Sequence, residues 1–206
     1  MFWLAVFSVP FENMPLGLGS FVSLAKIVGY VFVVFAFTQP RVCFRSVPRA
    51  FWCFGIYIVL CLVMAITQDE KYWPQVVIVL LTQCQLLMFF WIGYNLMRSD
   101  RIARGTLLTL VIAASVFAML SLSGIATKTL AVAGGERIKT LDTNPNSVAS
   151  HFVIGMLALI GSVYGRRKYG SKAGLLIWPV FILLATQLVR TGARTAVVSL
   201  KVGLLA

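Results

Sequence analysis

The sequence predicts an all-α, polytopic membrane protein, and composition and hydropathy are the observations that predict it. Of the 206 residues, 60% are hydrophobic and only 12% are charged, and the mean hydropathy is +0.92. Average soluble domains contain roughly 45–50% apolar and about 25% charged residues, so this composition excludes an ordinary soluble domain. It also excludes a disordered chain, because disorder requires low hydrophobicity. A span takes about 20 apolar residues. We therefore expect about six full spans, with partial segments at both ends.

Apolar segments follow one another along the chain and are separated by short polar connections. The segment 1–9 is too short to cross a bilayer alone, and the segment 195–206 begins a further helix. The segments between them that are predicted to span are 16–38, 51–67, 76–96, 106–126, 147–164 and 175–189. These segments leave no room for a separate soluble domain. The chain 1–206 is thus expected to be a single transmembrane domain.

The charged residues predict the orientation of these helices. Three alternate connections carry ten basic residues and one acid, Asp100; the basic residues are Arg41, Arg45, Arg49, Arg98, Arg101, Arg104, Arg166, Arg167, Lys168 and Lys172. Cytoplasmic loops collect Lys and Arg, so we expect these connections to be cytoplasmic. Tryptophans near the span ends are typical interfacial anchors; they are Trp52, Trp73, Trp91 and Trp178. Because the basic residues are dispersed over membrane loops, the net charge of +12 does not indicate nucleic-acid binding.

The cysteines and acidic residues indicate neither a disulfide framework nor a metal site. Cys43, Cys53, Cys61 and Cys84 fall in one short loop and two apolar stretches. No spacing among them resembles a zinc site, and none lies in an evident extracytoplasmic loop. No cluster of acids suggests a metal either, so we expect no metal and no cofactor.

Two outer connections carry basic residues where the positive-inside bias predicts few. Arg137 and Lys139 lie in the 20-residue connection 127–146, and Arg190 and Arg194 lie in the turn 189–196. A guanidinium is a planar, always-charged fork that suits phosphate oxygens. Two such turns could clamp a diphosphate at headgroup level. The alternative is that they pair with nearby acids or lipid phosphates and only anchor the loops.

The end of the long connection, DTNPN, consists of turn and cap formers before a predicted helix. Asn146 or Ser147 is expected to cap that helix, whose N-terminus then favours anions on the outer side. A helix cap without a ligand has the same spacing, and both interpretations stay open.

These residues resemble a known family. The segment 137–149, RIKTLDTNPNSVA, resembles the R…G.f..PN..A signature of the O-antigen ligase and O-antigen polymerase family. The segment 191–196, TGARTA, resembles its second signature, a TGSRG-like turn between two spans. The opening stretch LGSFVSLAKIVGY is also similar to the start of that family. The order and spacing of these features fit across essentially the whole chain.

The resemblance implies a multi-span glycosyltransferase at the outer face of the bacterial inner membrane. Such proteins transfer a glycan from undecaprenyl diphosphate to a lipid or glycan acceptor, in some relatives to a protein. By this resemblance Arg137 and Arg194 hold the diphosphate of the donor, and Asn146 forms part of the helix start that shapes the pocket. Arg190, in the same turn as Arg194, is a further candidate for diphosphate binding.

The sequence departs from the family pattern in two ways. Ala193-Arg194-Thr195 stands where the family usually has Ser-Arg-Gly. Family members are about twice as long, and their large periplasmic loop with a catalytic histidine follows the point where this sequence ends. We therefore expect an incomplete, inactive N-terminal portion, and the catalytic residue is unknown.

Several polar residues inside the apolar segments are further candidates. His151 lies just over one turn into its predicted span, where a neutral hydrogen-bond partner is commoner than a catalytic base. Lys26 either lines the donor cavity or extends outward to the interface. Gln83, Gln85, Asn95 and Gln187 are predicted to hydrogen-bond between helices.

Two other functions fit the same composition. A small-solute transporter would place polar groups or broken helices at the midplane, whereas this chain concentrates charge at the outer interface. A non-catalytic membrane fragment is the other alternative.

Overall fold

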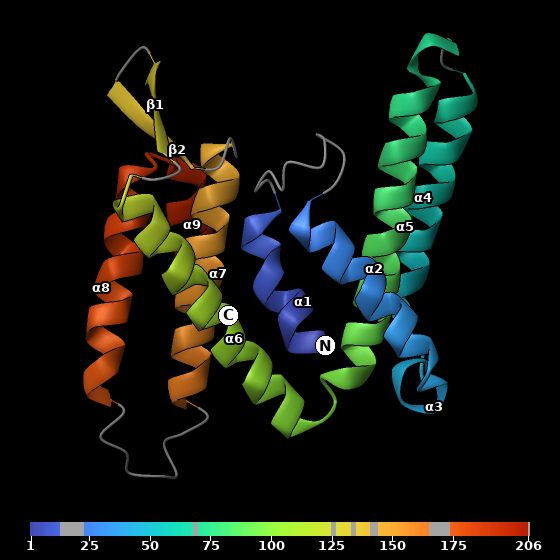
Figure 1. Cartoon of the computed structure of the whole chain (residues 1–206), viewed down its shortest axis with the longest axis horizontal. Coiled ribbons are helices and arrows are strands. Elements are labelled where there is room, and N and C mark those ends of the chain that lie inside the picture. Colours follow the sequence, from blue (N-terminus) through green and yellow to red (C-terminus); the bar gives the residue numbers. More distant parts are fainter. Residues whose placement is uncertain are drawn as a thin grey trace. The chain divides into compact units, whose positions relative to one another are not determined.

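A computed structural model describes residues 1–12, 23–67, 70–124, 127–132, 135–140, 144–164 and 174–205 (Figure 1). The described chain is helical except for one β-hairpin, so the all-α prediction is confirmed. The helical elements are α1 (Phe2–Ser8), η1 (Val9–Phe11), α2 (Leu24–Phe37), α3 (Pro40–Cys43), α4 (Arg49–Ile66), η2 (Glu70–Tyr72), α5 (Trp73–Leu96), α6 (Asp100–Leu122), α7 (Pro145–Tyr164), α8 (Gly174–Arg190) and α9 (Arg194–Leu205).

The hairpin lies within the long connection 127–146, which the sequence predicts to be a loop. Its strands are β1 (Thr127–Val132) and β2 (Gly135–Thr140). They pair antiparallel, with Thr127 opposite Thr140 and Val132 opposite Gly135.

Four of the described helices are long and apolar enough to cross a membrane: α4, α5, α6 and α7. The apolar helices α2 and α8 are shorter, with 14 and 17 residues. The bounds of α4, α5, α7 and α8 agree with the predicted segments to within three residues. The helix α6 begins six residues before the predicted segment 106–126 begins and ends four residues before that segment ends. The start of the predicted segment 16–38 falls partly on residues 13–22, which lie outside the described residues. These helices identify a membrane-associated protein.

The described chain divides into two compact units. Unit 1 comprises residues 1–2 and 27–103, and unit 2 comprises residues 3–26 and 104–206. Each unit contains helices from one contiguous half of the chain, together with a short piece from the N-terminal region.

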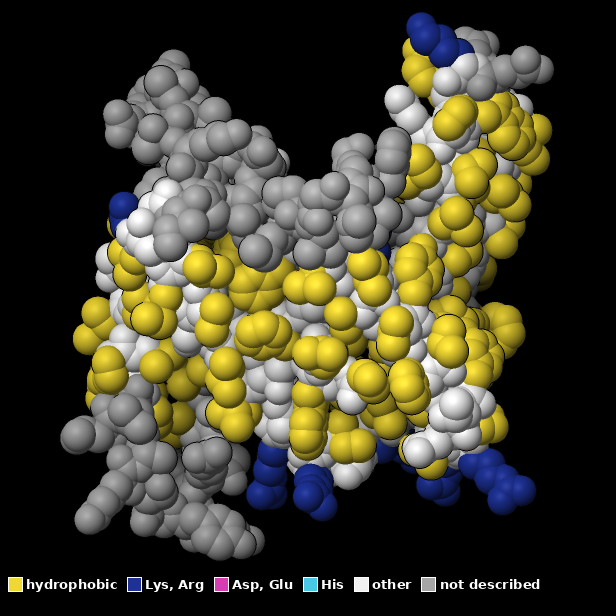
Figure 2. Space-filling view, viewed as in Figure 1, with side chains coloured by type: hydrophobic (Ala, Val, Ile, Leu, Met, Phe, Trp, Pro, Cys, Tyr) yellow, Lys and Arg dark blue, Asp and Glu magenta, His cyan; other side chains and the backbone are white. Residues whose placement is uncertain are grey.

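In unit 1, α4 and α5 contact each other as an antiparallel pair that follows from their short connection. Pro74 occupies the first turn of α5, where its missing N–H costs nothing. Apolar side chains are exposed along both helices, and Figure 2 shows them covering this helix pair. The rings of Phe2, Phe32 and Phe89 pack together, with Phe32 and Phe89 centroids 5.2 Å apart. Unit 1 therefore has little interior, and lipid is the surrounding that suits its surface.

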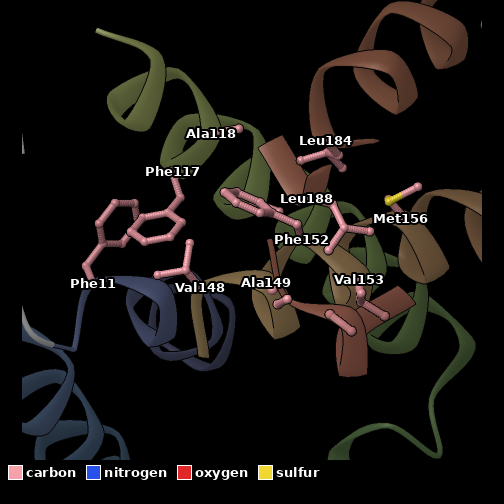
Figure 3. Packing of buried hydrophobic residues seen from close by; sticks show 13 residues of the cluster. Phe11, Phe117, Ala118, Val148, Ala149, Phe152, Val153, Met156, Leu184 and Leu188 are labelled. Carbon is pink, nitrogen blue, oxygen red and sulfur yellow. The ribbon is translucent and has the colours of Figure 1, made fainter. Parts of the chain in front are cut away.

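In unit 2, buried side chains from α6, α7, α8 and α9 form one contiguous core (Figure 3). Its largest fully buried members include Phe117, Phe152, Met156 and Leu184. The helices α6 and α7 approach closely at Gly155, where an added Cβ would collide with the Cβ of Ala114. Small residues permit such close approach in membrane helix bundles. This core positions the helix ends that carry the candidate site.

Candidate functional site

The helix α7 begins with a complete cap. The Asn146 N–H donates to Oδ1 of Asn144 at 2.9 Å, and the carbonyl of Asn144 accepts from the N–H groups of Ser147 and Val148. Pro145 occupies the first helical position, where its fixed φ fits the helix. The cap is therefore Asn144, earlier than the Asn146 or Ser147 that the sequence suggested. Asn146 lies in the first turn and is exposed.

The connection between α8 and α9 is a tight turn whose backbone is tied to α8. The Thr191 hydroxyl donates to the carbonyl of Leu188 at 2.6 Å and accepts from the Ala193 N–H at 3.4 Å. Gly192 has a φ of 62°, a conformation that suits a residue without Cβ. Thr191 and Ala193 are buried. The turn thus ends α8 at Arg190 and starts α9 at Arg194.

The helix α7 is the element around which the site segments gather. Within unit 2, β2, α8 and α9 all contact α7. Figure 1 shows the hairpin at the end of this group where α7 begins. Residues near the start of α7 and around the turn belong to the same buried cluster: Val148, Ala149, Leu188, Ala193 and Ala196. The elements that carry the two family-like motifs are therefore neighbours of one helix.

The predicted diphosphate-binding residues occupy these elements. Arg137 lies in β2, opposite Leu130, and Arg194 is the first residue of α9; the side chains of both lie outside the described residues. Arg190 ends α8 and is exposed, as is Asn146 in α7. The structure brings the backbone segments of these residues to one helix, and it describes the side chains of Arg190 and Asn146 only.

The helix starts in this part of unit 2 favour negative charge. Neither α7 nor α9 has an acidic residue in its first turn, so the partial positive charge of each N-terminus is not offset there.

Lys26 lies in the first turn of α2 and belongs to unit 2, and its backbone N–H donates to Oγ of Ser23 at 3.3 Å. A cation at a helix N-terminus is unfavourable for the helix itself. Lys26 is therefore placed near a helix end rather than at mid-span.

Two polar side chains lie deeper in unit 2. His151 is half-buried, and its ring meets the ring of Phe117 edge to face, with 6.0 Å between centroids. Gln187 is fully buried, and its Nε2 is the buried side-chain atom of the described residues that has no hydrogen-bond partner. The sequence predicts that Gln187 bonds to another helix, and no such bond is found for that nitrogen. A buried, unpaired amide donor costs about 1–3 kcal/mol, so this atom is suited to an additional partner.

Among the residues that the structure describes, no group of three or more His, Cys, Asp or Glu side chains is arranged to hold a metal ion.

In comparisons with known proteins, no family model, no curated protein and no solved structure matches the chain.

Proposed function

We propose that this protein is a membrane glycosyltransferase of the O-antigen ligase or polymerase type, which binds an undecaprenyl-diphosphate-linked glycan. The observation that carries the proposal is that β2, with Arg137, and α9, with Arg194, contact the same helix, α7. Motifs separated along the chain by more than one helix thus belong to neighbouring elements. The uncompensated N-termini of α7 and α9 add positive potential to the same group of elements.

The proposed chemistry is electrostatic stabilisation of the leaving group. When the bond between the glycan and the lipid diphosphate breaks, negative charge develops on the diphosphate oxygens. Arg137 and Arg194 stabilise that charge, with Arg190 and Asn146 as further diphosphate contacts. A base must accept the proton of the acceptor hydroxyl, and no residue of this chain is assigned to that step. The transfer needs no metal ion in this scheme.

The proposed topology places this site at the outer face of a bacterial inner membrane. Counting α2 and α8 as spans in addition to α4, α5, α6 and α7 gives six crossings. The positive-inside rule then puts the arginine-rich connections in the cytoplasm and the hairpin on the opposite side. The acceptor is a lipid or another glycan chain that is exposed on that outer side.

The experiment compares arginine variants in membranes that contain the protein. We expect Arg137→Ala and Arg194→Ala to abolish the binding of undecaprenyl diphosphate, with membrane insertion unchanged. Lys201→Ala is the matched control, because Lys201 is an exposed cation further along α9. Near-normal binding by both arginine variants would contradict the proposal that Arg137 and Arg194 hold the diphosphate.

A small-solute transporter is the second candidate, and the unpaired Nε2 of Gln187 favours it. Transporters present polar groups to solutes within the membrane. Proteoliposomes that contain the purified chain separate the two functions. Uptake of a solute that depends on Gln187 but not on Arg137 or Arg194 would favour transport over glycan transfer.

A further inference from the structure

A cluster of hydrogen bonds in unit 1 fixes the turn between α3 and α4 onto the end of α5. Asn95, which is buried, accepts from the N–H of Ser46 at 2.9 Å and donates to its carbonyl at 2.8 Å. Trp91 Nε1 donates to the same carbonyl at 2.9 Å. The Trp91 ring packs against Phe44 and Phe51, with centroids 4.9 and 5.0 Å away. Trp91 thus holds this turn in place, although the sequence marks it as an interfacial anchor. We call these contacts the Ser46–Asn95 clamp.

The clamp also determines where Arg98 lies. The hydroxyl of Ser46 donates to Oδ1 of Asn95 and accepts from Nη1 of Arg98, both at 3.0 Å. The guanidinium of Arg98 is therefore held beside the turn that carries Arg45, 53 positions earlier in the sequence. Since one nitrogen is anchored, the remaining N–H groups of Arg98 are oriented before any ligand arrives.

Five exposed arginines gather at this end of unit 1: Arg41, Arg45, Arg49, Arg98 and Arg101. We call them the arginine surface, and Figure 2 shows basic side chains beside α3. The only acid in the same segments is Asp100. No lysine lies among them. An arginine guanidinium can make two parallel hydrogen bonds to a phosphate, whereas a lysine ammonium acts as a single point charge.

Exposed apolar side chains stand next to these arginines. Val42 is 51% exposed and Val47 is 42% exposed, one residue from Arg41 and two from Arg45. Met97, which precedes Arg98, and Trp52, near Arg49, are exposed as well. A soluble anion would gain nothing from these side chains. A ligand with both a phosphate and a hydrocarbon chain would contact both kinds of residue.

We propose that the arginine surface, ordered by the Ser46–Asn95 clamp, binds the phosphate headgroups of anionic phospholipids. The acyl chains lie against Val42, Val47 and Met97, and the guanidinium groups contact the phosphate oxygens. Clusters of basic residues beside membrane helices attract anionic lipids, and each residue contributes about fivefold in affinity. The proposal concerns residues outside the outer site, so it stands or falls independently of glycan transfer.

The test uses the purified 206-residue chain in neutral detergent micelles, titrated with phosphatidylglycerol or phosphatidylcholine. The thermal unfolding midpoint is expected to rise saturably with phosphatidylglycerol only, because a ligand that binds the folded state stabilises it. The double variant Arg45→Gln, Arg98→Gln is expected to lower the apparent affinity by roughly tenfold or more. Lys71→Gln is the matched control, since Lys71 is exposed at the other end of α5 and its removal leaves the affinity unchanged.

Ser46→Ala tests the role of the clamp separately, because it keeps all five arginines and removes the acceptor of Arg98. A partial loss of affinity, smaller than that of the double variant, is expected. If the double variant does not fold, the single variants Arg45→Gln and Arg98→Gln carry the same comparison. Equal responses to the two lipids, or an equal loss in Lys71→Gln, would overturn the proposal. So would binding of polyglutamate without any preference for phosphatidylglycerol, which indicates an acidic polypeptide as the partner.

Discussion

The two units stabilise apolar helices in different ways. In the span windows of α4 and α5, only 6% and 11% of the residues are buried within the protein, against 39% and 44% in α6 and α7. Unit 1 exposes its apolar residues and is held by aromatic contacts and the Ser46–Asn95 clamp. Unit 2 encloses a core that reaches the candidate site. Similar hydropathy thus serves two purposes, since lipid solvates one set of side chains and protein surrounds the other.

The largest expected effect is the loss of a core ring from unit 2. Phe152→Ala should destabilise the fold by about 3–5 kcal/mol, because the removed ring leaves a cavity beside Phe117. Phe90→Ala in α5 is the matched control, since its side chain is 40% exposed. Unfolding in detergent, followed by circular dichroism, measures both variants. Equal losses of stability in the two variants would contradict the conclusion that unit 2 has a packed core and unit 1 does not.

A second comparison inserts a side chain instead of removing one. Gly155→Leu should cost up to about 3 kcal/mol, because the new side chain meets Ala114 and Leu184. Gly55→Leu in α4 should be tolerated, because no atom lies within 4 Å of a Cβ at that position. The recovery of monodisperse protein after detergent extraction reports both variants. Poor recovery of Gly55→Leu would show that α4 has a packing partner.

The clamp of unit 1 is expected to contribute less than the core of unit 2. Asn95→Ala removes bonds to both polar groups of the Ser46 backbone and should destabilise the turn by about 1–2 kcal/mol. Loosening of the turn exposes Cys43, which is buried in α3. The rate of thiol labelling, measured with Cys53, Cys61 and Cys84 replaced by Ser, should therefore increase. An unchanged rate would mean that other contacts hold α3.

The same cysteine predicts a pH dependence. Burial raises the pKa of the Cys43 thiol above its usual value. Because the thiolate is the reactive form, labelling of the intact protein should be slow at neutral pH and accelerate as the pH approaches the raised pKa. In Asn95→Ala the pKa should return toward its usual value, so the two rates differ most near neutral pH and converge at high pH. Parallel pH profiles would contradict this explanation.

The smallest expected effect is at Gln187. Gln187→Leu replaces an unpaired buried amide by an apolar side chain of similar size, so the stability should stay unchanged or rise by about 1 kcal/mol. If Gln187 contacts a ligand, the same variant loses binding or transport while remaining folded. A loss of stability above about 1 kcal/mol would show that the amide has a structural partner.

The sequence predicts most of the helices but little of the way in which they meet. The apolar runs from residue 51 to 96 correspond closely to α4 and α5, because a span is a local property of about 20 residues. The helix cap is Asn144 rather than Asn146 or Ser147, although all three residue types are good caps. Pro145 occupies the first helical position, so the residue before it becomes the cap. The hairpin was missed because strands of six residues give a weak signal beside long apolar helices.

The candidate site shows the same division. Its residue types are readable in the sequence, since charge placement points to Arg137, Lys139, Arg190 and Arg194. The choice of Arg137 and Arg194 among them depends on the resemblance to a family. The hydrogen-bond partners of polar residues are harder to predict, since Asn95 and Gln187 are both amide side chains within apolar segments. In the structure Asn95 is bonded to Ser46, whereas the Nε2 of Gln187 is unpaired. A hydrogen bond across 49 residues leaves no local pattern from which to predict it.

By itself, the sequence determined the class of protein and most of its helical segments, and it showed that basic residues gather in alternate connections. Each of these depends on hydropathy and charge within one stretch of chain. Only the tertiary structure decided that β2, α8 and α9 contact α7 and that Ser46 is hydrogen-bonded to Asn95. It also decided that only 6% of the span window of α4 is buried within the protein. The physical reason is that contacts between distant segments depend on side-chain shape and on small residues such as Gly155. The average polarity of a segment therefore does not predict these contacts.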